Sequence, residues 1–574
     1  MIILGIKLTH DGAVALIDNG RLIFCYEMEK INNAARYSVF CISMEEVEDI
    51  LIGYGYTLEG VDRVVIDGWT TMDWDNSING VERRGTLAKF MWKGQPVEIT
   101  PLELAGYGHF VKKEDSVLTP YDFVYKDTQF VYRSYLHVSG HIAAAYCSSP
   151  FSARKEDAYI LIWDGGMPPQ LFYYRPRRRQ VVNLGILFPL AGYLYNNFSH
   201  AFEPFNSMEQ SLAIAGKAMA YMALGKINVR ILERYRSIFA ELEQMSFNVK
   251  ANFEVIAVIT AHFIKIASEF GKPEQFADAD MLTTFQEFVK ELLIERLSRK
   301  VKEYPGFTGN LCLSGGCALN IKWNSEIRKS GMFKEVWVPP FPNDSGSAIG
   351  TACCEMIQSD GISSLDWNVY SGPDIGCNHH SNGFFFEHEN GYKAVPCSLE
   401  ELANFLVASG DPVVFLNGRA ELGPRALGNR SILAPAVCAE MKDTLNRIKG
   451  RENYRPVAPI CLEEHAPTIF TPGSTDPYML FEHHVKETWK ARVPAICHLD
   501  GTARLQTVNA GSGKIYELLT HYHQKSGIPL LCNTSANLNG SGFFPDIQSA
   551  MKWGKANFIW HNDTLFTRKE PAIL

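Results

Sequence analysis

Two histidines, His137 and His141, lie four residues apart in the segment HVSGH, among small and apolar residues. Positions i and i+4 share one face of a helix, so both imidazoles could ligate the same metal ion. Two protein ligands rarely suffice, and the carboxylates best placed to complete the set are Asp164, in WDGG, and Asp344, in FPNDSGSA. Such a set suits Fe(II), Mn(II) or Zn(II). The sequence thus predicts a four-ligand metal site; two packed core histidines are the alternative for the pair alone.

Three turns that combine a polar residue with glycine follow apolar runs typical of strands. They are HDG at 10–12, DGG at 164–166 and SGG at 314–316. Glycine lets the main chain approach a phosphate, and the amides of the turn can donate to it. Three such turns resemble the phosphate loops of the actin/sugar-kinase/Hsp70-type ATPase fold, with its two duplicated lobes around a cleft. On that resemblance the candidate nucleotide contacts are Gly165, Gly166, Gly315, Gly316 and Asn320.

The elements that must position these groups alternate between strand and helix. The runs IILGIK, AVALID and LIFCYE, separated by HDG and NG, predict consecutive strands, and RVVIDGW and AYILIWDGG predict further buried strands. Apolar residues at helical spacing predict long helices between about 228 and 305. The turn-rich segment 361–384 lacks periodicity and predicts a linker. We therefore expect an α/β protein with a two-lobed domain at 1–360, carrying a helical insertion, and a second α/β domain at 385–574.

The composition is that of an ordinary globular enzyme. The 574 residues include 21% charged and 46% hydrophobic residues and carry a net charge of −8, which argues against bulk attraction to nucleic acid or membrane. Thirteen cysteines without a CxxC pair indicate free thiols in a reducing cytosol. No secretory leader is visible, and no segment approaches the roughly 20 apolar residues that a membrane span needs. We expect a cytoplasmic protein.

Motifs along nearly the whole chain resemble the O-carbamoyltransferase family, which includes antibiotic-tailoring and nodulation-factor enzymes. HDGAVALIDNGRL, HVSGH, WDGG, AGKAMAYMALGK, LSGGCALN and PNDSGSAIG are similar to its TsaD-like half. GRAELGPRALGNRSILA, LNRIKGRENYRPVAPI, HLDGTARLQTV and LLCNTSAN are similar to its YrdC-like half. The resemblance implies that the second half makes carbamoyl-adenylate from carbamoyl phosphate and ATP, with Mg²⁺. The first half would then transfer the carbamoyl group to an acceptor hydroxyl.

The second half is rich in cationic residues within short motifs. Carbamoyl phosphate and ATP carry many anionic oxygens, so a site for both needs guanidinium and ammonium groups. The candidates are Arg425, Arg430, Lys449, Arg451, Arg455 and Arg504, together with Ser535 and Asn537. The resemblance assigns substrate contacts to all of these except Arg430 and Arg451. A solvated surface charge is the alternative for any single arginine.

In the first half, the resemblance implies a metal ion, with Fe(II) as the first choice, that acts as a Lewis acid on the activated intermediate. The acceptor hydroxyl needs a base, and His10, beside Asp11, is the candidate because an ordinary imidazole titrates near pH ~6.5. A structural histidine that caps its loop is the alternative. Lys217, in GKAM, is a candidate phosphate contact. The chain reads HDGA and NGSGFFPD where relatives usually carry HDAS and a glutamate, which affects acceptor and nucleotide fit rather than the reaction.

The acceptor is left open by the sequence. A natural-product or sugar hydroxyl is the family default. A basic hairpin tip consists of Arg175, Arg177, Arg178 and Arg179. Together with a resemblance of KLTHDGAVAL and EMEKINNAARYS to bacteriophage carbamoyltransferases, it makes 5-hydroxymethylcytosine in DNA an alternative acceptor. A solvated tip is the competing interpretation. Two other functions also stay open: tRNA threonylcarbamoyl-type N-carbamoylation and a non-catalytic nucleotide-binding module. A homodimer is the default oligomer.

Overall fold

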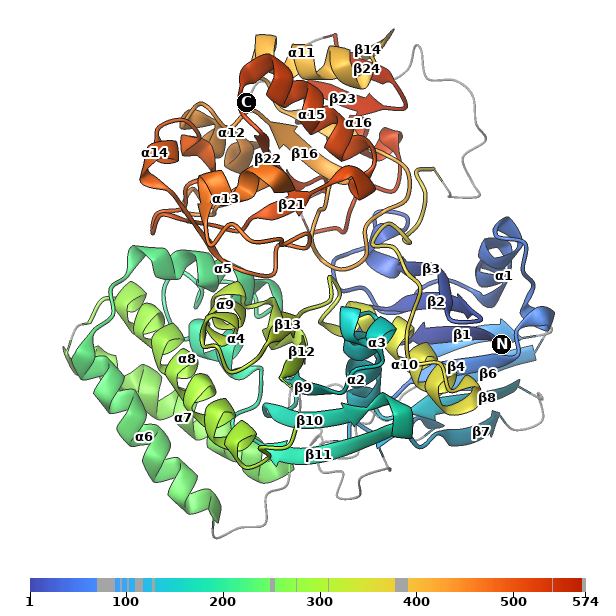
Figure 1. The fold of residues 1–574 in the computed structure, drawn as a ribbon, viewed down its shortest axis with the longest axis vertical. Helices are drawn as coiled ribbons and strands as arrows, with labels where there is room; N and C mark the ends of the chain where they lie inside the picture. Colours follow the sequence, from blue (N-terminus) through green and yellow to red (C-terminus); the bar gives the residue numbers. More distant parts are fainter. Residues whose placement is uncertain are drawn as a thin grey trace. The chain divides into compact units, whose positions relative to one another are not determined.

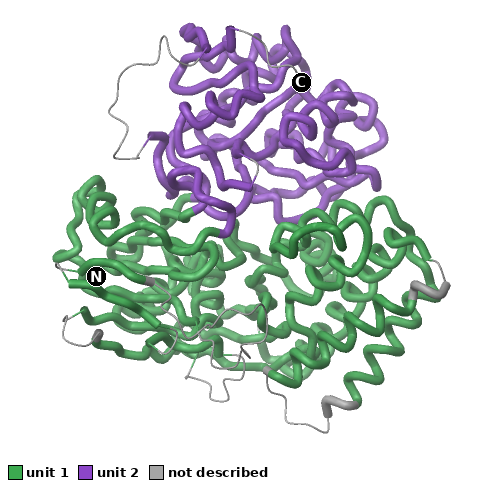
Figure 2. The backbone as a smooth tube through the Cα atoms, turned by 180° about the vertical axis from the view of Figure 1, so that it is seen from behind, with its two compact units in different colours: residues 1–28, 38–368 green, residues 29–37, 369–574 purple. Residues whose placement is uncertain are grey.

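The structure is a computed structural model (Figure 1). Its chain divides into two compact units, residues 1–28 with 38–368 and residues 29–37 with 369–574 (Figure 2). The residues that the structure describes are 1–69, 88–92, 95–100, 103–108, 117–125, 130–247, 253–274, 276–307, 309–376, 391–538 and 540–569. Across these ranges, no helix has both the length and the apolar character that crossing a membrane requires.

The first unit contains two mixed sheets that share the order and direction of five strands, and the first sheet has β7 (Tyr121–Tyr125) as a sixth. The first has the order β3 (Arg21–Glu27), β2 (Ala13–Asp18), β1 (Ile2–Lys7), β4 (Arg63–Asp67), β8 (Phe130–Tyr135) and β7. The second has the order β11 (Gln180–Ile186), β10 (Gln170–Arg175), β9 (Ala158–Ile162), β12 (Asn310–Ser314) and β13 (Glu335–Trp337). In both, an antiparallel meander of three strands continues into two parallel strands. One topology therefore occurs twice in this unit.

Two buried helices, α2 (His137–Cys147) and α10 (Ser347–Glu355), pack against each other between these sheets (Figure 1). α10 contacts β1, β2 and β4, whereas α2 contacts β9 and β12. Every residue of both helices is buried, which explains why most of their residues are small or apolar. A Cβ added to Gly350 would collide with the carbonyl of Gly140, so these two glycines set how closely the helices approach. The first residues of α2 and the turn before α10 carry predicted metal ligands.

The long helices expected between 228 and 305 are present as α6 (Val229–Phe247), α7 (Phe253–Glu274) and α8 (Asp278–Lys302). They lie in the chain between β11 and β12, as an insertion in the second of the two repeated topologies. Stacked aromatic rings join α7 to α8, since the Phe263 and Phe288 centroids are 5.4 Å apart. Phe285 of α8 also stacks on Phe198 of α4 (Leu194–Ser199), with the centroids 4.1 Å apart.

The second unit is built on an eight-stranded mixed sheet. Its strand order is β14 (Tyr392–Pro396), β24 (Thr564–Arg568), β23 (Phe558–His561), β15 (Val413–Leu416), β16 (Arg430–Ala434), β22 (Leu530–Ser535), β17 (Ala458–Leu462) and β21 (Gln506–Val508). The helices α11 (Leu399–Ser409), α12 (Glu440–Ile448) and α15 (Lys514–Ser526) bury apolar residues in the same core as the strands. The loops after β15, α12 and β22 carry predicted anion-binding residues.

Smaller elements complete both units. In the first they are α1 (Met44–Gly53), β5 (Ala88–Trp92), β6 (Gln95–Ile99), α3 (Pro150–Arg154), α4 (Leu194–Ser199), α5 (Ala213–Tyr221) and α9 (Ile321–Lys329). In the second they are α13 (Ala466–Ile469), β18 (Phe470–Thr471), β19 (His483–Val485), α14 (Glu487–Lys490), β20 (Thr502–Ala503) and α16 (Ile547–Trp553).

The predicted α/β class is confirmed at the level of mixed sheets and helices. The change from one unit to the other at 368/369 falls inside the expected linker, 361–384, whose residues from 377 onward lie outside the described ranges. The sequence analysis did not predict that residues 29–37, near the start of the chain, belong to the second unit.

Candidate functional site

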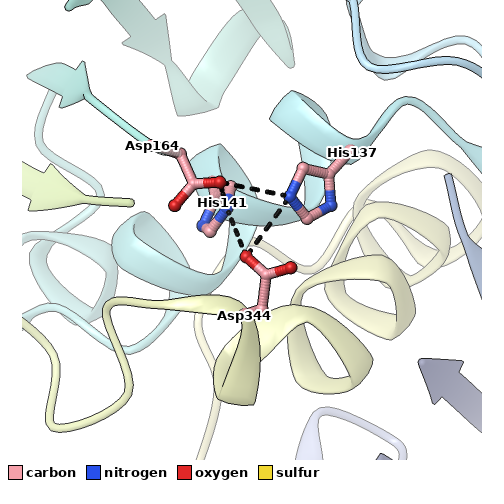
Figure 3. A group of neighbouring side chains, drawn as sticks. All are labelled: His137, His141, Asp164 and Asp344. Carbon is pink, nitrogen blue, oxygen red and sulfur yellow. Dashed lines mark ion pairs between the residues drawn. The ribbon is translucent and has the colours of Figure 1, made fainter. Parts of the chain in front are cut away.

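Four side chains of the first unit converge: His137, His141, Asp164 and Asp344 (Figure 3). All four are buried, and each offers one ligand atom within 4.8 Å of the others. Asp344 Oδ1 lies 3.4 Å from the Nε2 atoms of both histidines. Neither Nε2 atom has a hydrogen-bond partner among the described residues. Buried nitrogens without partners, facing carboxylate oxygens, have the chemistry of a metal-ligand set.

Each of these ligands is placed by the end of a regular element. His137 and His141 are one turn apart at the start of α2, Asp164 follows β9, and Asp344 begins the short turn that leads into α10. The SGG turn after β12 supports Asp164, because the amide of Gly316 donates to its Oδ1 at 2.6 Å. Gly315 has a φ of +88°, and a Cβ there would collide with the carbonyl of Trp163. That turn therefore needs glycine for a tight approach.

Hydrogen bonds determine the tautomers of the two histidines. His137 Nδ1 lies 2.8 Å from Oδ2 of Asp67, at the end of β4. His141 Nδ1 lies 3.2 Å from Oγ of Ser314, whose own hydroxyl donates to the carbonyl of Pro342 at 3.0 Å. Asp67 and Ser314 are thus the acceptors, and each Nδ1 carries the proton. Both Nε2 lone pairs are consequently directed to the carboxylates, as in metal-binding histidines.

Lys7 is a buried cation that the sequence interpretation missed. Its Nζ lies 2.9 Å from Asp67 Oδ2 and 3.0 Å from Asp344 Oδ2. Burial would lower the pKa of Lys7, but the two carboxylates raise it above its ordinary value. Burial likewise opposes ionisation of Asp344, yet the charge of Lys7 holds the pKa of that carboxyl well below its usual range. Lys7 therefore keeps the ligand Asp344 ionised.

The signal for Lys7 and Asp67 was available in the sequence. Lys7 is the one ionisable residue of the strand IILGIK and ends it, and Asp67 ends the strand RVVID directly after the apolar run VVI. A charged residue at the end of a buried strand needs a partner. Two aromatic residues also escaped notice: the ring of Tyr107 lies 4.9 Å from that of His137, and Trp69 lies beneath Lys7 at 5.0 Å.

His10 lies next to this cluster. Its Nδ1 is 2.9 Å from Oδ2 of Asp11 and its Nε2 is 3.7 Å from Oδ2 of Asp344. With 38% of its side chain exposed, it is far more accessible than Asp344. Burial lowers the pKa of His10, but Asp344 and the hydrogen bond to Asp11 raise it overall. Asp11 adopts a φ of +56° and also accepts from Asn343 Nδ2 at 3.3 Å, so its carboxylate is fixed in place.

The candidate nucleotide and phosphate contacts of the first unit differ in their surroundings. Apart from its chain neighbours, no atom of the described residues lies within 4 Å of the position that a Cβ of Gly165 would occupy. This open space is compatible with a ligand that approaches the main chain there. Asn320 pairs its side-chain amide with that of Gln286 and caps α9, which is a structural arrangement. The ammonium of Lys217, on α5, lies 3.7 Å from the sulfur of Met208. These residues stay predictions, as does Gly166.

In the second unit, the predicted cations form a crowded group. Burial, followed by repulsion from nearby Arg455, lowers the pKa of Arg451 to about 9 and that of Arg504 to about 10. The pKa values of Arg425 and Lys449 also fall well below their ordinary range, again through burial and repulsion by other cations. Arg455 has a carboxylate partner, since its Nη1 lies 3.7 Å from Oε2 of Glu452. Positive charge that is crowded and half-buried weakens a fold and is typical of a site that receives an anion.

Lys449 connects this group to the segment after β22. Its Nζ donates to the carbonyl of Ser535 at 2.7 Å and to that of Asn537 at 3.1 Å, and it also contacts the side-chain oxygen of Asn537. The hydroxyl of Ser535 donates to the same side-chain oxygen at 2.7 Å. Residues from two distant motifs therefore form one wall of the cationic site.

Arg430 differs from the other predicted cations. It is only 1% exposed. Its guanidinium donates to the main-chain carbonyls of Asn417 at 2.8 Å and Gly418 at 2.9 Å. These contacts favour a role in holding its loop rather than a substrate. The carboxylate of Glu421 orders the same loop, since it accepts from the amides of Leu427 at 2.5 Å and Arg430 at 3.2 Å.

The basic tip lies between β10 and β11. Arg177, Arg178 and Arg179 are exposed there. Arg175 is half-buried, with its guanidinium 5.2 Å from the ring of Phe307 and donating to Gln180 at 3.1 Å. The exposed group thus consists of three arginines rather than four.

Comparison with known proteins identifies the class. Residues 2–353 match the family model described as "Carbamoyltransferase N-terminus", and residues 404–565 match "Carbamoyltransferase C-terminus". The protein is thus a carbamoyl-transferring enzyme. The chain is 43% identical over 589 residues to Nodulation protein U of Rhizobium tropici, covering 100% of this chain and 97% of the relative. It is 30% identical over 577 residues to the 3'-hydroxymethylcephem-O-carbamoyltransferase of Streptomyces clavuligerus, covering 99% of both.

The chain belongs to the O-carbamoyltransferase family, which confirms the predicted enzyme class. Among solved structures, full-length HypF in its phosphate- and nucleotide-bound form matches with a TM-score of 0.29 and 12% identity, over 63% of this chain and 56% of that one. A similarity this low carries no argument about the fold.

Proposed function

We propose that the protein is an ATP-dependent O-carbamoyltransferase that works in two stages. The second unit forms carbamoyl-adenylate from carbamoyl phosphate and ATP, and the first unit transfers the carbamoyl group to an acceptor hydroxyl. The observation that carries the proposal is the pairing, in one chain, of a buried His₂Asp₂ cluster with a crowded group of half-buried cations that repel one another. The first is suited to a metal ion and the second to a polyanion.

The first stage has a defined balance. Carbamoyl phosphate, ATP and one water yield carbamoyl-adenylate, phosphate and pyrophosphate, so a carbamate oxygen must attack the α-phosphorus of ATP while pyrophosphate leaves. Arg425, Arg455 and Arg504 neutralise the phosphate oxygens, and Lys449, held by Ser535 and Asn537, contacts a further anionic oxygen. Arg451 adds a further positive charge to this site. Arg430 holds the loop in this proposal.

In the second stage, the acceptor oxygen attacks the carbamoyl carbon and AMP leaves. His10 Nε2 takes the hydroxyl proton, while Asp11 holds His10 Nδ1. A divalent ion, with Fe(II) as the first choice and Mn(II) or Zn(II) as the others, would be held by the four converging side chains and would supply Lewis-acid stabilisation of the developing charge. The Nε2 atoms of His137 and His141, buried and without hydrogen bonds in the described part of the chain, fit such an ion.

The proposal extends to the two folds. The repeated strand order of the first unit supports an actin/sugar-kinase/Hsp70-like, TsaD-like architecture with two duplicated lobes. For the second unit we retain the YrdC-like assignment, which rests on its motifs. The division into domains at 1–360 and 385–574 stays a proposal with it.

For the acceptor, we favour the hydroxyl of a small natural product or sugar, because one relative is named for a hydroxymethyl cephem. The three exposed arginines at the tip between β10 and β11 support 5-hydroxymethylcytosine in DNA as the second candidate.

The test is to incubate the full-length protein with carbamoyl phosphate, ATP, Mg²⁺, Fe(II) and a panel of acceptors. We expect carbamoyl-phosphate-dependent release of pyrophosphate and an acceptor whose mass increases by one carbamoyl group. A threonylcarbamoyl adduct on tRNA would replace the proposal with N-carbamoylation. Absence of pyrophosphate release would remove the adenylate stage.

A further inference from the structure

Residues 29–37, which we call the strap, belong to the second unit although their neighbours in the chain, Met28 and Ser38, belong to the first. The strap pairs with the segment after β22. The amide of Arg36 donates to the carbonyl of Gly540 at 2.9 Å, and the amide of Gly542 donates to that of Ala34 at 3.1 Å. This main-chain pairing makes the strap an added edge of the segment that follows Ser535 and Asn537.

Two side chains anchor the strap further. Lys30 is 1% exposed, and its Nζ donates to the carbonyls of Glu421 and Gly423, the latter at 2.9 Å. Asn33 Nδ2 donates to Ser549 Oγ at 2.7 Å. Because Lys30 holds the carbonyls just before Arg425, the strap helps to shape the loop that presents this predicted substrate contact.

Arg36 brings its own charge into the cationic site. Its Nη2 donates to the carbonyl of Pro424 at 3.2 Å, next to Arg425 in the chain. With 35% of its side chain exposed, it is more accessible than Lys30. Burial is the largest cause of the lowered pKa values of Arg425, Lys449 and Arg504, and the charge of Arg36 lowers each of them further. Arg36 therefore lies close enough to interact electrostatically with three predicted substrate contacts.

The backbone beside Arg36 is strained. Tyr37 has a φ of +62°, in the left-handed region that a bulky residue rarely adopts. Glu29 holds this conformation, since its Oε2 accepts from the amide of Tyr37 at 3.3 Å and lies 4.0 Å from Nε of Arg36. A Cβ added to Gly542 would collide with the carbonyl of Glu29, so the docking also depends on that glycine. Strain held in place by surrounding contacts is typical of functional segments.

We propose that Arg36 is a phosphate-binding residue of the second unit's site, delivered by the strap from the N-terminal part of the chain. Its ligand is a phosphate oxyanion, either the phosphate of carbamoyl phosphate or a phosphate of ATP. The proposal rests on the adenylate-forming function of this unit and adds to it a contact from outside the C-terminal half. The cationic site is then incomplete without residues 29–37.

The experiment uses the full-length protein and three substitutions of Arg36. Arg36→Ala removes the group, Arg36→Lys keeps the charge, and Arg36→Gln keeps an amide donor without charge. Arg21→Ala is the matched control, because Arg21 is also an arginine of the N-terminal segment but its side chain is 73% exposed beside Asp366. Calorimetric titration measures binding of inorganic phosphate and, separately, of Mg·ATP; melting temperature without ligand reports on folding.

For Arg36→Ala we expect weaker phosphate or Mg·ATP binding by roughly 10- to 100-fold, the loss of one charge-assisted hydrogen bond. Arg36→Lys should recover part of the affinity and Arg36→Gln should not. The ligand whose binding falls more identifies the phosphate that Arg36 contacts. The melting temperature without ligand should stay level or rise, because one repelling charge is gone; Arg21→Ala should match the unsubstituted protein.

Two results would overturn the inference. One is unchanged binding of both ligands by Arg36→Ala. The other is weaker binding with a clearly lower melting temperature and no difference between Arg36→Lys and Arg36→Gln, which would make Arg36 a structural clamp. Absence of pyrophosphate release by the unsubstituted protein would refute the adenylate function alone, and the binding data would still decide the role of Arg36.

Discussion

Nζ of Lys7 lies 3.0 Å from Oδ2 of Asp344, and the two side chains are only 1% and 3% exposed. The first strand of the chain is thus joined to a residue more than half the chain away by a buried ion pair. Asp67 accepts from the same ammonium and from His137. One lysine therefore balances the charge of a predicted ligand and of the carboxylate that orients another.

We first predict that Lys7→Met destabilises the protein by about 3–5 kcal/mol, because it leaves two carboxylates buried without a cation. A divalent metal should recover part of this loss, since it supplies positive charge to Asp344. Urea unfolding with a chelator, and then with excess Mn(II), measures both effects. Lys329→Met, at a side chain that is 78% exposed, should change neither. Full stability of Lys7→Met in the presence of the chelator would contradict the prediction.

The second prediction concerns Asp67. Asp67→Asn weakens the acceptor that holds His137 Nδ1–H, so metal affinity should fall by roughly 10- to 100-fold. Competition with a fluorescent chelator measures this affinity directly. Asp122→Asn serves as the control, because Asp122 is 68% exposed and pairs with Arg133. An Asp67→Asn variant with ordinary metal affinity would show that this hydrogen bond does not orient the ligand.

A third prediction separates the two stages. Lys449→Met should abolish pyrophosphate release together with product, because it removes an anion contact of the second unit. Asp344→Asn should keep carbamoyl-phosphate-dependent pyrophosphate release and lose the carbamoylated product. Pyrophosphate release and product mass are measured in the same reaction. If Asp344→Asn also stops pyrophosphate release, the assignment of the two stages to separate sites is wrong.

The fourth prediction is a pH dependence. The folded-state pKa of Lys449 lies below its ordinary value of 10.5, so the unfolded state binds more protons in the interval between the two. The penalty from Lys449 is therefore full below the folded-state pKa and disappears as pH rises to the unfolded-state value. Lys449→Met should raise the melting temperature at about pH 7.5 and progressively less towards about pH 10. Thermal melts of both proteins across this range supply the difference. A stability gain that grows with pH would contradict the sign.

The fifth prediction tests the basic tip. If the acceptor is a base in DNA, replacing Arg177, Arg178 and Arg179 together by Ala should weaken polynucleotide binding and reduce its dependence on salt. Stability should stay within about 0.5 kcal/mol, because all three side chains are exposed. Binding is measured by fluorescence anisotropy at several salt concentrations. Unchanged binding would remove the local support for DNA and leave a small-molecule hydroxyl.

Local motifs were enough to select four side chains that the fold brings together. His137 and His141 at helical spacing, with Asp164 and Asp344 in glycine-rich turns, were chosen from local sequence, and the four side chains do converge. Local chemistry carries this information, because a ligand at a strand end or helix start needs small residues beside it. Lys7 and Asp67 were missed because each acts through its contact with the other, and neither strand sequence alone indicates which residue will be its partner.

Local sequence by itself determined which elements form, which residues could bind a metal or an anion, and the family to which the chain belongs. The tertiary structure alone decided that Asp67 orients His137, that Arg430 donates to its own loop, and that residues 29–37 pair with the segment at 540–542. Spacing along the chain encodes contacts within one element, through the helical and strand periods. Contacts between distant segments arise only when buried polar groups must find partners, and that requirement is met in three dimensions.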